Sequence, residues 1–199
     1  MMTIAQISDT HFGTEVIDVV AALKLSLEEV NPDLILLSGD ITQRARKSQF
    51  RAAKNFLEAT GAPYFTIPGN HDLPLFDIIT RFTRPYRFYK DFFGKREFIH
   101  VQNNVALVGL DATHPWHHKM GSLDLPHVSR ILTEARKKLA SNGLLLVSVH
   151  QPLLTAWRED RSEEIIGERA IANLFSEHGV DAVISGHVHV PLICLSDKL

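Results

Sequence analysis

Apolar positions along the chain follow two alternating patterns, and this alternation predicts the fold. Short runs such as 33–38 are apolar at nearly every position, which is typical of strands buried on both faces. Longer segments such as 47–59 repeat apolar residues at helical spacing and end close to a glycine. Alternating strands and helices of this kind predict an α/β protein with mainly parallel strands and covering helices.

The expected elements follow from these patterns and from the turn residues between them. Strands are expected at 3–8, 33–38, 63–67, 98–102, 105–110, 144–149 and 181–185, and helices at 15–30, 47–59, 125–140 and 168–178. Asn103-Asn104 between two of these strands predicts a hairpin. Residues 73–97 are expected to form an excursion with one short helix, and 155–166 a charged loop. Without an internal repeat or a domain boundary, residues 1–199 are expected to form a single domain.

Composition narrows the class of protein. Hydrophobic residues make up 45% of the 199 residues, enough for an ordinary core. The formal net charge of −2 gives no general attraction to nucleic acid or to an anionic membrane. Cys194 is the single cysteine, so an internal disulfide and a cysteine metal cluster are excluded, and we expect it in the core. No secretory signal or membrane-length apolar run is recognised, so a cytoplasmic location is expected.

Residues that can bind a metal follow five of the expected buried strands. In α/β sheets, ligands bind beyond the carboxyl ends of the strands, so these side chains are expected to converge. A single histidine after a strand is usually part of the hydrogen-bonded structure, whereas five such strand ends together favour a metal site. The candidate metal ligands are Asp9, His11, Asp40, Asn70, His150, His187 and His189.

Seven candidates are too many for one tetrahedral ion and fit two divalent ions about 3.5–4 Å apart, bridged by a carboxylate and a water. The pairs Asp9/His11 and His187/His189 have i, i+2 spacing, so each pair is expected to point to one side of an extended backbone. Burying the aspartates and histidines together without a cation would cost several kcal/mol.

The charge of such a centre indicates the substrate. Two divalent ions outweigh the negative charges of Asp9 and Asp40, so the site would be net positive and would attract a phosphate ester. A metal-bound hydroxide is the expected nucleophile, because no serine or cysteine nucleophile is evident at a strand end.

Five blocks in order, Asp9-x-His11, Gly39-Asp40, Gly69-Asn70-His71-Asp72, His150 and Gly186-His187-x-His189, resemble the calcineurin-like metallophosphoesterases. The resemblance implies a four-layer α/β/β/α sandwich. It also implies two metal ions with Asp40 as the bridge. The implied ligands of the first ion are Asp9, His11, Asp40 and His189, and those of the second are Asp40, Asn70, His150 and His187.

The same resemblance implies the catalytic residues. His71 would stabilise the transition state or protonate the leaving oxygen, paired with Asp72 or another nearby carboxylate. Together with Gly39-Asp40-Ile41-Thr42, the block at 69–72 looks most like the bacterial cyclic-nucleotide phosphodiesterase-like (class III) group. Two features depart from that group. The group usually has His-His-Pro where this chain has His150-Gln151-Pro152. Its chains also continue beyond the point corresponding to Leu199, so either the second sheet is incomplete or the chain is truncated.

The predicted function is a dinuclear-metal phosphoesterase acting on a small phosphate ester or nucleotide, with a cyclic nucleotide as one candidate. A nuclease of the same superfamily and a non-catalytic metal-binding scaffold are the alternatives. Imidazole and carboxylate ligands suit manganese, iron and zinc alike. The expected partner is the substrate, with a homodimer as a further candidate; a nucleic acid is disfavoured and no membrane is expected.

Two other segments carry open alternatives. The arginine- and aromatic-rich stretch 81–96 could bind a phosphate chain or a base, but its dense aromatics favour a helical cap whose cations face water. His114, His117 and His118, with Trp116, lie in a loop that either borders the site or is simply solvated.

Overall fold

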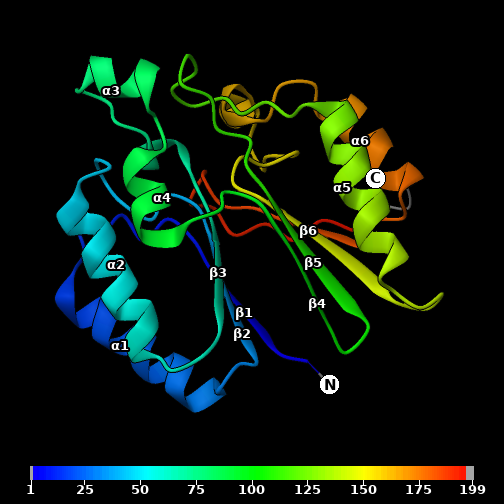
Figure 1. Ribbon diagram of the computed structural model, residues 1–199, viewed down its shortest axis with the longest axis horizontal. Helices are drawn as coiled ribbons and strands as arrows, with labels where there is room; N and C mark the ends of the chain where they lie inside the picture. The colour runs from blue at the N-terminus through cyan, green and yellow to red at the C-terminus, as the bar shows by residue number, and fades with distance from the viewer. Residues whose placement is uncertain (1, 196–199) are drawn as a thin grey trace.

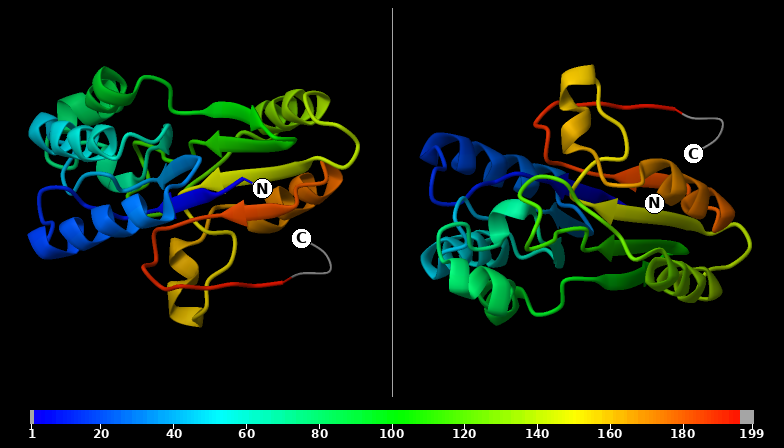
Figure 2. Two further views of the ribbon diagram at one scale, coloured as in Figure 1. Left: turned by 90° about the horizontal axis from the view of Figure 1, so that it is seen from below. Right: turned by 90° about the horizontal axis from the view of Figure 1, so that it is seen from above.

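Two β-sheets lie face to face between two groups of helices in the computed structural model, which describes residues 2–195 apart from the side chains of residues 158 and 159 (Figures 1 and 2). The first sheet has the order β1-β2-β3 and is parallel; the second has the order β4-β5-β6-β7, with β4 antiparallel to β5 and the others parallel. The strands are β1 (Ile4–Ile7), β2 (Leu34–Ser38), β3 (Tyr64–Ile67), β4 (Phe98–Gln102), β5 (Val105–Leu110), β6 (Leu144–Val149) and β7 (Ala182–Ile184).

The helices form the two outer layers. Figure 1 shows α1 (Ile17–Val30) and α2 (Lys47–Ala59) on one side of the sheets and α5 (Leu125–Lys137) and α6 (Glu168–Glu177) on the other. The four-layer α/β/β/α arrangement implied by the resemblance is therefore present. Shorter helices lie in the connections: η1 (Asn70–Asp72), α3 (Ile78–Thr83), α4 (Arg87–Phe93) and η2 (Arg158–Glu163).

The continuous apolar run of β2 is explained by burial on both faces. Ile35 and Leu37 belong to the core shared with α1, α2 and α4, whereas Leu34 and Leu36 pack between the two sheets with Leu107. A third core, around Val147, lies between the second sheet and the helices α5 and α6. Strand β2 is thus held rigidly from both sides, which fixes the position of the loop that follows it.

Several sequence predictions need correction. The last strand was expected to be buried, but all three residues of β7 are partly exposed because it is an edge strand. Residues 73–97 form two helices, α3 and α4, where one was expected. The helix expected at 15–30 begins at Ile17, and its apolar residues Val19 and Val30 are exposed while Leu27 is buried. Cys194 is also exposed, so its expected core position is wrong. No described helix is both long and apolar enough to cross a membrane.

The stretch 81–96 has a structural role in this fold. Tyr89 is fully buried in the core beneath α2, and Phe88, Phe92 and Phe93 pack against that core. Arg81, expected to face water, is instead buried, and its guanidinium donates to the carbonyl oxygens of three residues. These acceptors are Pro74, Pro115 and His117. The arginine therefore fastens the loop that contains the three histidines 114, 117 and 118 to the start of the excursion.

Candidate metal centre

The carboxyl ends of β1, β2, β3, β6 and β7 meet at one edge of the two sheets, and the seven candidate ligands lie in the loops that leave them. Three groups of side chains bring their ligand atoms within 4.8 Å of one another. These groups are Asp9–His11–His189, His11–Asp40–His71 and Asp40–His150–His187. The expected convergence of strand ends is therefore found, with Asp40 shared between two groups.

The backbone brings these side chains together in a way that was not expected. Asp9, His11, Asp40, His187 and His189 all have positive φ angles, between 41° and 77°. The two i, i+2 pairs are therefore not extended, and the predicted reason for their convergence is wrong. Residues other than glycine rarely adopt this conformation, and it is concentrated at functional sites where the surrounding structure enforces it.

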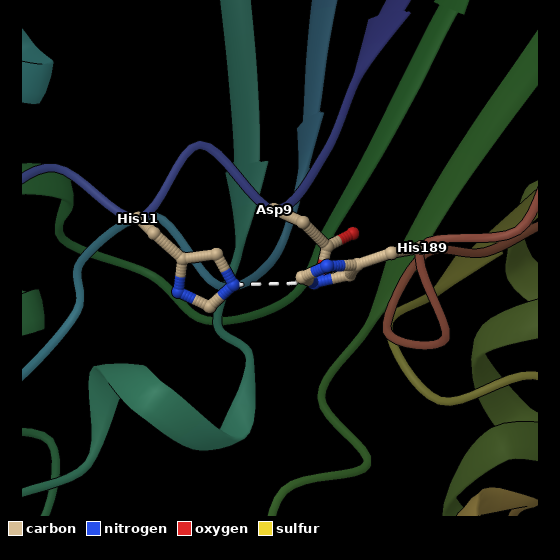
Figure 3. A group of neighbouring side chains, drawn as sticks. All are labelled: Asp9, His11 and His189. Carbon is tan, nitrogen blue, oxygen red and sulfur yellow. Dashed lines mark hydrogen bonds and ion pairs between the residues drawn. The ribbon is translucent and has the colours of Figure 1, made fainter. Parts of the chain in front are cut away.

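The first group joins the two ends of the described chain (Figure 3). The Nε2 atoms of His11 and His189 lie 3.3 Å apart, and His189 Nε2 lies 3.3 Å from an oxygen of Asp9. When two nitrogens each lie about 2.1 Å from one ion, octahedral or tetrahedral angles place the nitrogens about 3.0–3.4 Å apart. The spacing of the two imidazoles therefore fits a shared ion.

The two oxygens of Asp40 face different groups. Its Oδ1 lies 3.3 Å from His150 Nε2, while its Oδ2 lies 3.8 Å from His11 Nε2. The backbone N–H of His71 also donates to Oδ1, at 2.8 Å, and fixes the carboxylate. A buried carboxylate held in this orientation can bridge two cations.

Unpaired buried atoms supply a test of whether metal ions fit here. Among the described residues, Asn70 Oδ1 and His150 Nε2 are buried and have no hydrogen-bond partner, although nearly all such atoms in proteins have one. His150 Nδ1 donates to the carbonyl oxygen of Ser38, at 2.8 Å, so Nε2 is the nitrogen that has the lone pair when the ring is neutral. An amide oxygen and an imidazole lone pair are both metal ligands, so the donor set fits the implied ions.

The pKa values show how strongly these groups interact without a cation. Burial acts to lower the pKa of His150, but the adjacent Asp40 carboxylate outweighs it and raises the pKa to about 9. Burial acts to raise the pKa of Asp40, but the charge of His150 outweighs it and holds that pKa well below its usual value. Burial, followed by the charge of His150, lowers the pKa of His187 to about 4.

Glycines leave room for the ligands. A Cβ at Gly39 would lie 2.3 Å from His150 Nδ1, and one at Gly69 would lie 2.2 Å from Asp40 Oδ1. A Cβ at Gly186 would lie 2.5 Å from an oxygen of Asp9. The glycines of the motifs are thus required by close approach to the candidate ligands.

His71 and Asp72 have separate environments. His71 lines the cavity, and its Nδ1 lies 3.1 Å from the carbonyl oxygen of Gln43. Asp72 is only 1% exposed, and its carboxylate accepts hydrogen bonds from the backbone of Ile41, Thr42 and Gly69. Asp72 is therefore not the partner of His71, because its carboxylate ties the loop after β2 to the loop after β3. The nearby carboxylate that the prediction also allowed is Asp40, whose ligand atom lies within 4.8 Å of that of His71.

A cavity of about 450 Å³ opens above the candidate ligands. Besides His71, its wall includes His118, Lys119, Asp160 and Glu163. Of the three histidines in the 111–124 loop, His118 thus borders the site. Glu163 was missed by sequence reasoning, because it lies in a segment whose charges are typical of a solvated loop. Nothing in the spacing of that segment distinguishes it from an ordinary surface turn.

Comparisons with known proteins agree with this geometry. The model of the calcineurin-like phosphoesterase family matches residues 2–191. The chain belongs to this family. Its members are phosphoesterases, and this calcineurin-like phosphoesterase is accordingly a metal-dependent phosphoric ester hydrolase, as the sequence predicted.

Two relatives and one solved structure illustrate the similarity. The chain is 24% identical to a probable glycerophosphodiester phosphodiesterase, GpdQ, of Arcobacter nitrofigilis, over 100% of this chain and 76% of that protein. It is 23% identical to a probable cyclic nucleotide phosphodiesterase of Vesicomyosocius okutanii, over 94% of this chain and 78% of that protein. A dimetal phosphatase from Danio rerio has the same fold, with a TM-score of 0.67 at 17% identity, over 94% of this chain and 82% of that one.

Proposed function

We propose that this calcineurin-like phosphoesterase hydrolyses small phosphodiesters at a centre of two metal ions. The observation that carries the proposal is the orientation of Asp40, whose two oxygens face His150 on one side and His11 on the other. One carboxylate between two sets of imidazoles is the arrangement that a pair of bridged ions needs. When bound, the two ions would activate a water molecule and neutralise charge on the phosphate.

We propose the division of ligands between the two ions that the family resemblance implies, and the groups Asp9–His11–His189 and Asp40–His150–His187 support it. We assign Asp9, His11, Asp40 and His189 to the first ion and Asp40, Asn70, His150 and His187 to the second. The unpaired Asn70 Oδ1 and His150 Nε2 support the second set. Nitrogen and oxygen donors without a thiolate suit manganese, iron or zinc, and we propose ions of this kind.

We assign the proton transfer to His71. Its Nδ1 is held by the Gln43 carbonyl, and its side chain lines the cavity beside the candidate ligands. A ring held through Nδ1 presents Nε2 to a substrate, and its protonated form can donate a proton to the leaving oxygen. Asp72 supports this residue only indirectly, because it holds the backbone on which His71 lies.

The cavity and the named relatives support a proposal for the substrate class. A cavity of about 450 Å³ accommodates a molecule the size of a nucleotide or a glycerophosphodiester. The two named relatives are a probable glycerophosphodiester phosphodiesterase and a probable cyclic nucleotide phosphodiesterase. We propose these two classes as the candidates. A single domain, a homodimer and a cytoplasmic location stay predictions from the sequence.

Turnover by the manganese-reconstituted protein tests the proposal. The panel comprises glycerophosphodiesters, cyclic nucleotides, phosphomonoesters and single-stranded DNA. We expect the highest kcat/KM on one of the small diesters. Preferential cleavage of DNA would instead identify a nuclease, and two bound ions without turnover of any ester would identify a non-catalytic scaffold.

A further inference from the structure

Glu163 contacts the imidazole ring of His187 at Nε2, and the other ring nitrogen, Nδ1, is not part of this contact. The Nε2 of His187 lies 3.0 Å from Oε2 of Glu163. A carboxylate at this distance can only accept, so Nε2 carries the hydrogen and Nδ1 keeps its lone pair. The side chain of His187 is only 5% exposed, which leaves its ring little freedom to reorient.

The position of Glu163 is itself fixed. Its second oxygen, Oε1, forms an ion pair with Lys119, which lies in the 111–124 loop. The side chain of Glu163 is 18% exposed, whereas that of Lys119 is mostly exposed. The contact therefore connects three separate segments: the 111–124 loop, the end of η2 and the turn after β7.

We propose that Glu163 is a positioning residue for the second metal ion, holding the ring of His187 so that Nδ1 is free for that ion. Metal-binding histidines usually donate their other N–H to a carboxylate or carbonyl, and this partner fixes the tautomer and the ring orientation. His150 is held in an equivalent way, because its Nδ1 donates to the carbonyl oxygen of Ser38. Each of the two imidazoles assigned to the second ion thus has one ring nitrogen bonded to an acceptor and the other available to the ion. The inference rests on the proposed assignment of His187 as a ligand.

The test measures manganese binding, with Glu163→Ala and Glu163→Gln as the variants. Asp160→Asn is the matched control, because Asp160 lines the same cavity from the same short helix and loses the same charge. Binding of Mn²⁺ to the metal-free proteins is titrated calorimetrically, and the coupled pair of ions is followed by its electron paramagnetic resonance signal. The affinities of the first and second ions are compared separately.

We expect Glu163→Ala to lower the affinity for the second ion by about 10–100-fold and to leave the affinity for the first ion unchanged. Glu163→Gln keeps an acceptor oxygen without the charge, so its loss should be smaller, and Asp160→Asn should match the wild type. Second-ion affinity in both Glu163 variants equal to that of Asp160→Asn would overturn the inference. His187→Ala tests the assignment of His187 as a ligand separately from the role of Glu163. If it still binds two ions with wild-type affinity, the proposed ligand assignment itself is wrong.

Discussion

The Nδ1 of His150 donates a hydrogen bond to the carbonyl oxygen of Ser38 across 2.8 Å, and this bond joins the ends of the two sheets. Ser38 is the last residue of β2 and His150 follows β6. Both residues are fully buried. Because the carbonyl can only accept, the bond fixes Nε2 as the nitrogen that has the lone pair in the neutral ring, and Nε2 is the nitrogen that faces Asp40.

Gly39→Ala should displace His150 and weaken metal binding. The new Cβ would lie 2.3 Å from His150 Nδ1, at a residue whose φ is +96°. Gly61→Ala is the control, since its φ of +72° imposes comparable backbone strain in open space. We expect both variants to lose about 1 kcal/mol or more of stability from strain, but only Gly39→Ala to lose Mn²⁺ affinity in calorimetric titration. Equal metal affinities in the two variants would contradict this account of Gly39.

His71→Ala should lower kcat by about 10²–10⁴-fold while two ions remain bound, because the loss removes a proton donor and no assigned ligand. The backbone hydrogen bond from residue 71 to Asp40 survives the change. His117→Ala is the control, because His117 lies in the neighbouring loop against His114 and away from the cavity wall. Steady-state kinetics measure kcat, and elemental analysis measures the number of bound ions. An unchanged kcat would refute the catalytic assignment, and a lost ion would make His71 a ligand.

Asp72→Ala should destabilise the metal-free protein by about 3–5 kcal/mol. The change leaves the buried backbone N–H groups of Ile41, Thr42 and Gly69 without their acceptor. Asp91→Ala, at an exposed position in α4, should remain close to the wild type. Urea unfolding measures both values. A loss no larger than that of the control would show that the Asp72 hydrogen bonds do not hold the two loops.

The metal-free protein should become less stable as the pH rises from 6.5 to about 9. Asp40 raises the pKa of His150 to about 9 in the folded protein, above its ordinary value of 6.5. The folded state therefore binds this proton more tightly, and its contribution is complete below pH 6.5 and lost as the pH rises through 9. In His150→Gln this pH-dependent component should be absent. Identical pH profiles of the urea midpoint in the two proteins would contradict the prediction.

Elements with strong local signals could be predicted from the sequence. Helix α2 and the β4–β5 hairpin have the expected bounds, because amphipathic spacing and an Asn-Asn turn are local properties. Burial was less predictable. The residues of β7 read as core because they are apolar, but whether a strand lies at a sheet edge depends on strand order. Tertiary contacts likewise decided the burial of Arg81, whose acceptors are distant carbonyl groups.

The site was predictable to a similar extent. Asp40 and His150 could be brought together in advance, because both follow strands whose carboxyl ends share one edge. The left-handed conformation of His11 and His187 could not be predicted, because histidine residues rarely adopt a positive φ and nothing in the sequence indicates one here. Glu163 contacts His187 from a short helix in a charged segment, and only the folded structure distinguishes it from the charges around it.

Metal reconstitution tests the central claim most directly. The metal-free protein is titrated with Mn²⁺ while bound ions per chain and hydrolysis of bis-p-nitrophenyl phosphate are measured in the same samples. We expect negligible hydrolysis without metal, and activity that rises until two ions are bound per chain. Full hydrolysis by protein that elemental analysis shows to be metal-free would contradict the claim.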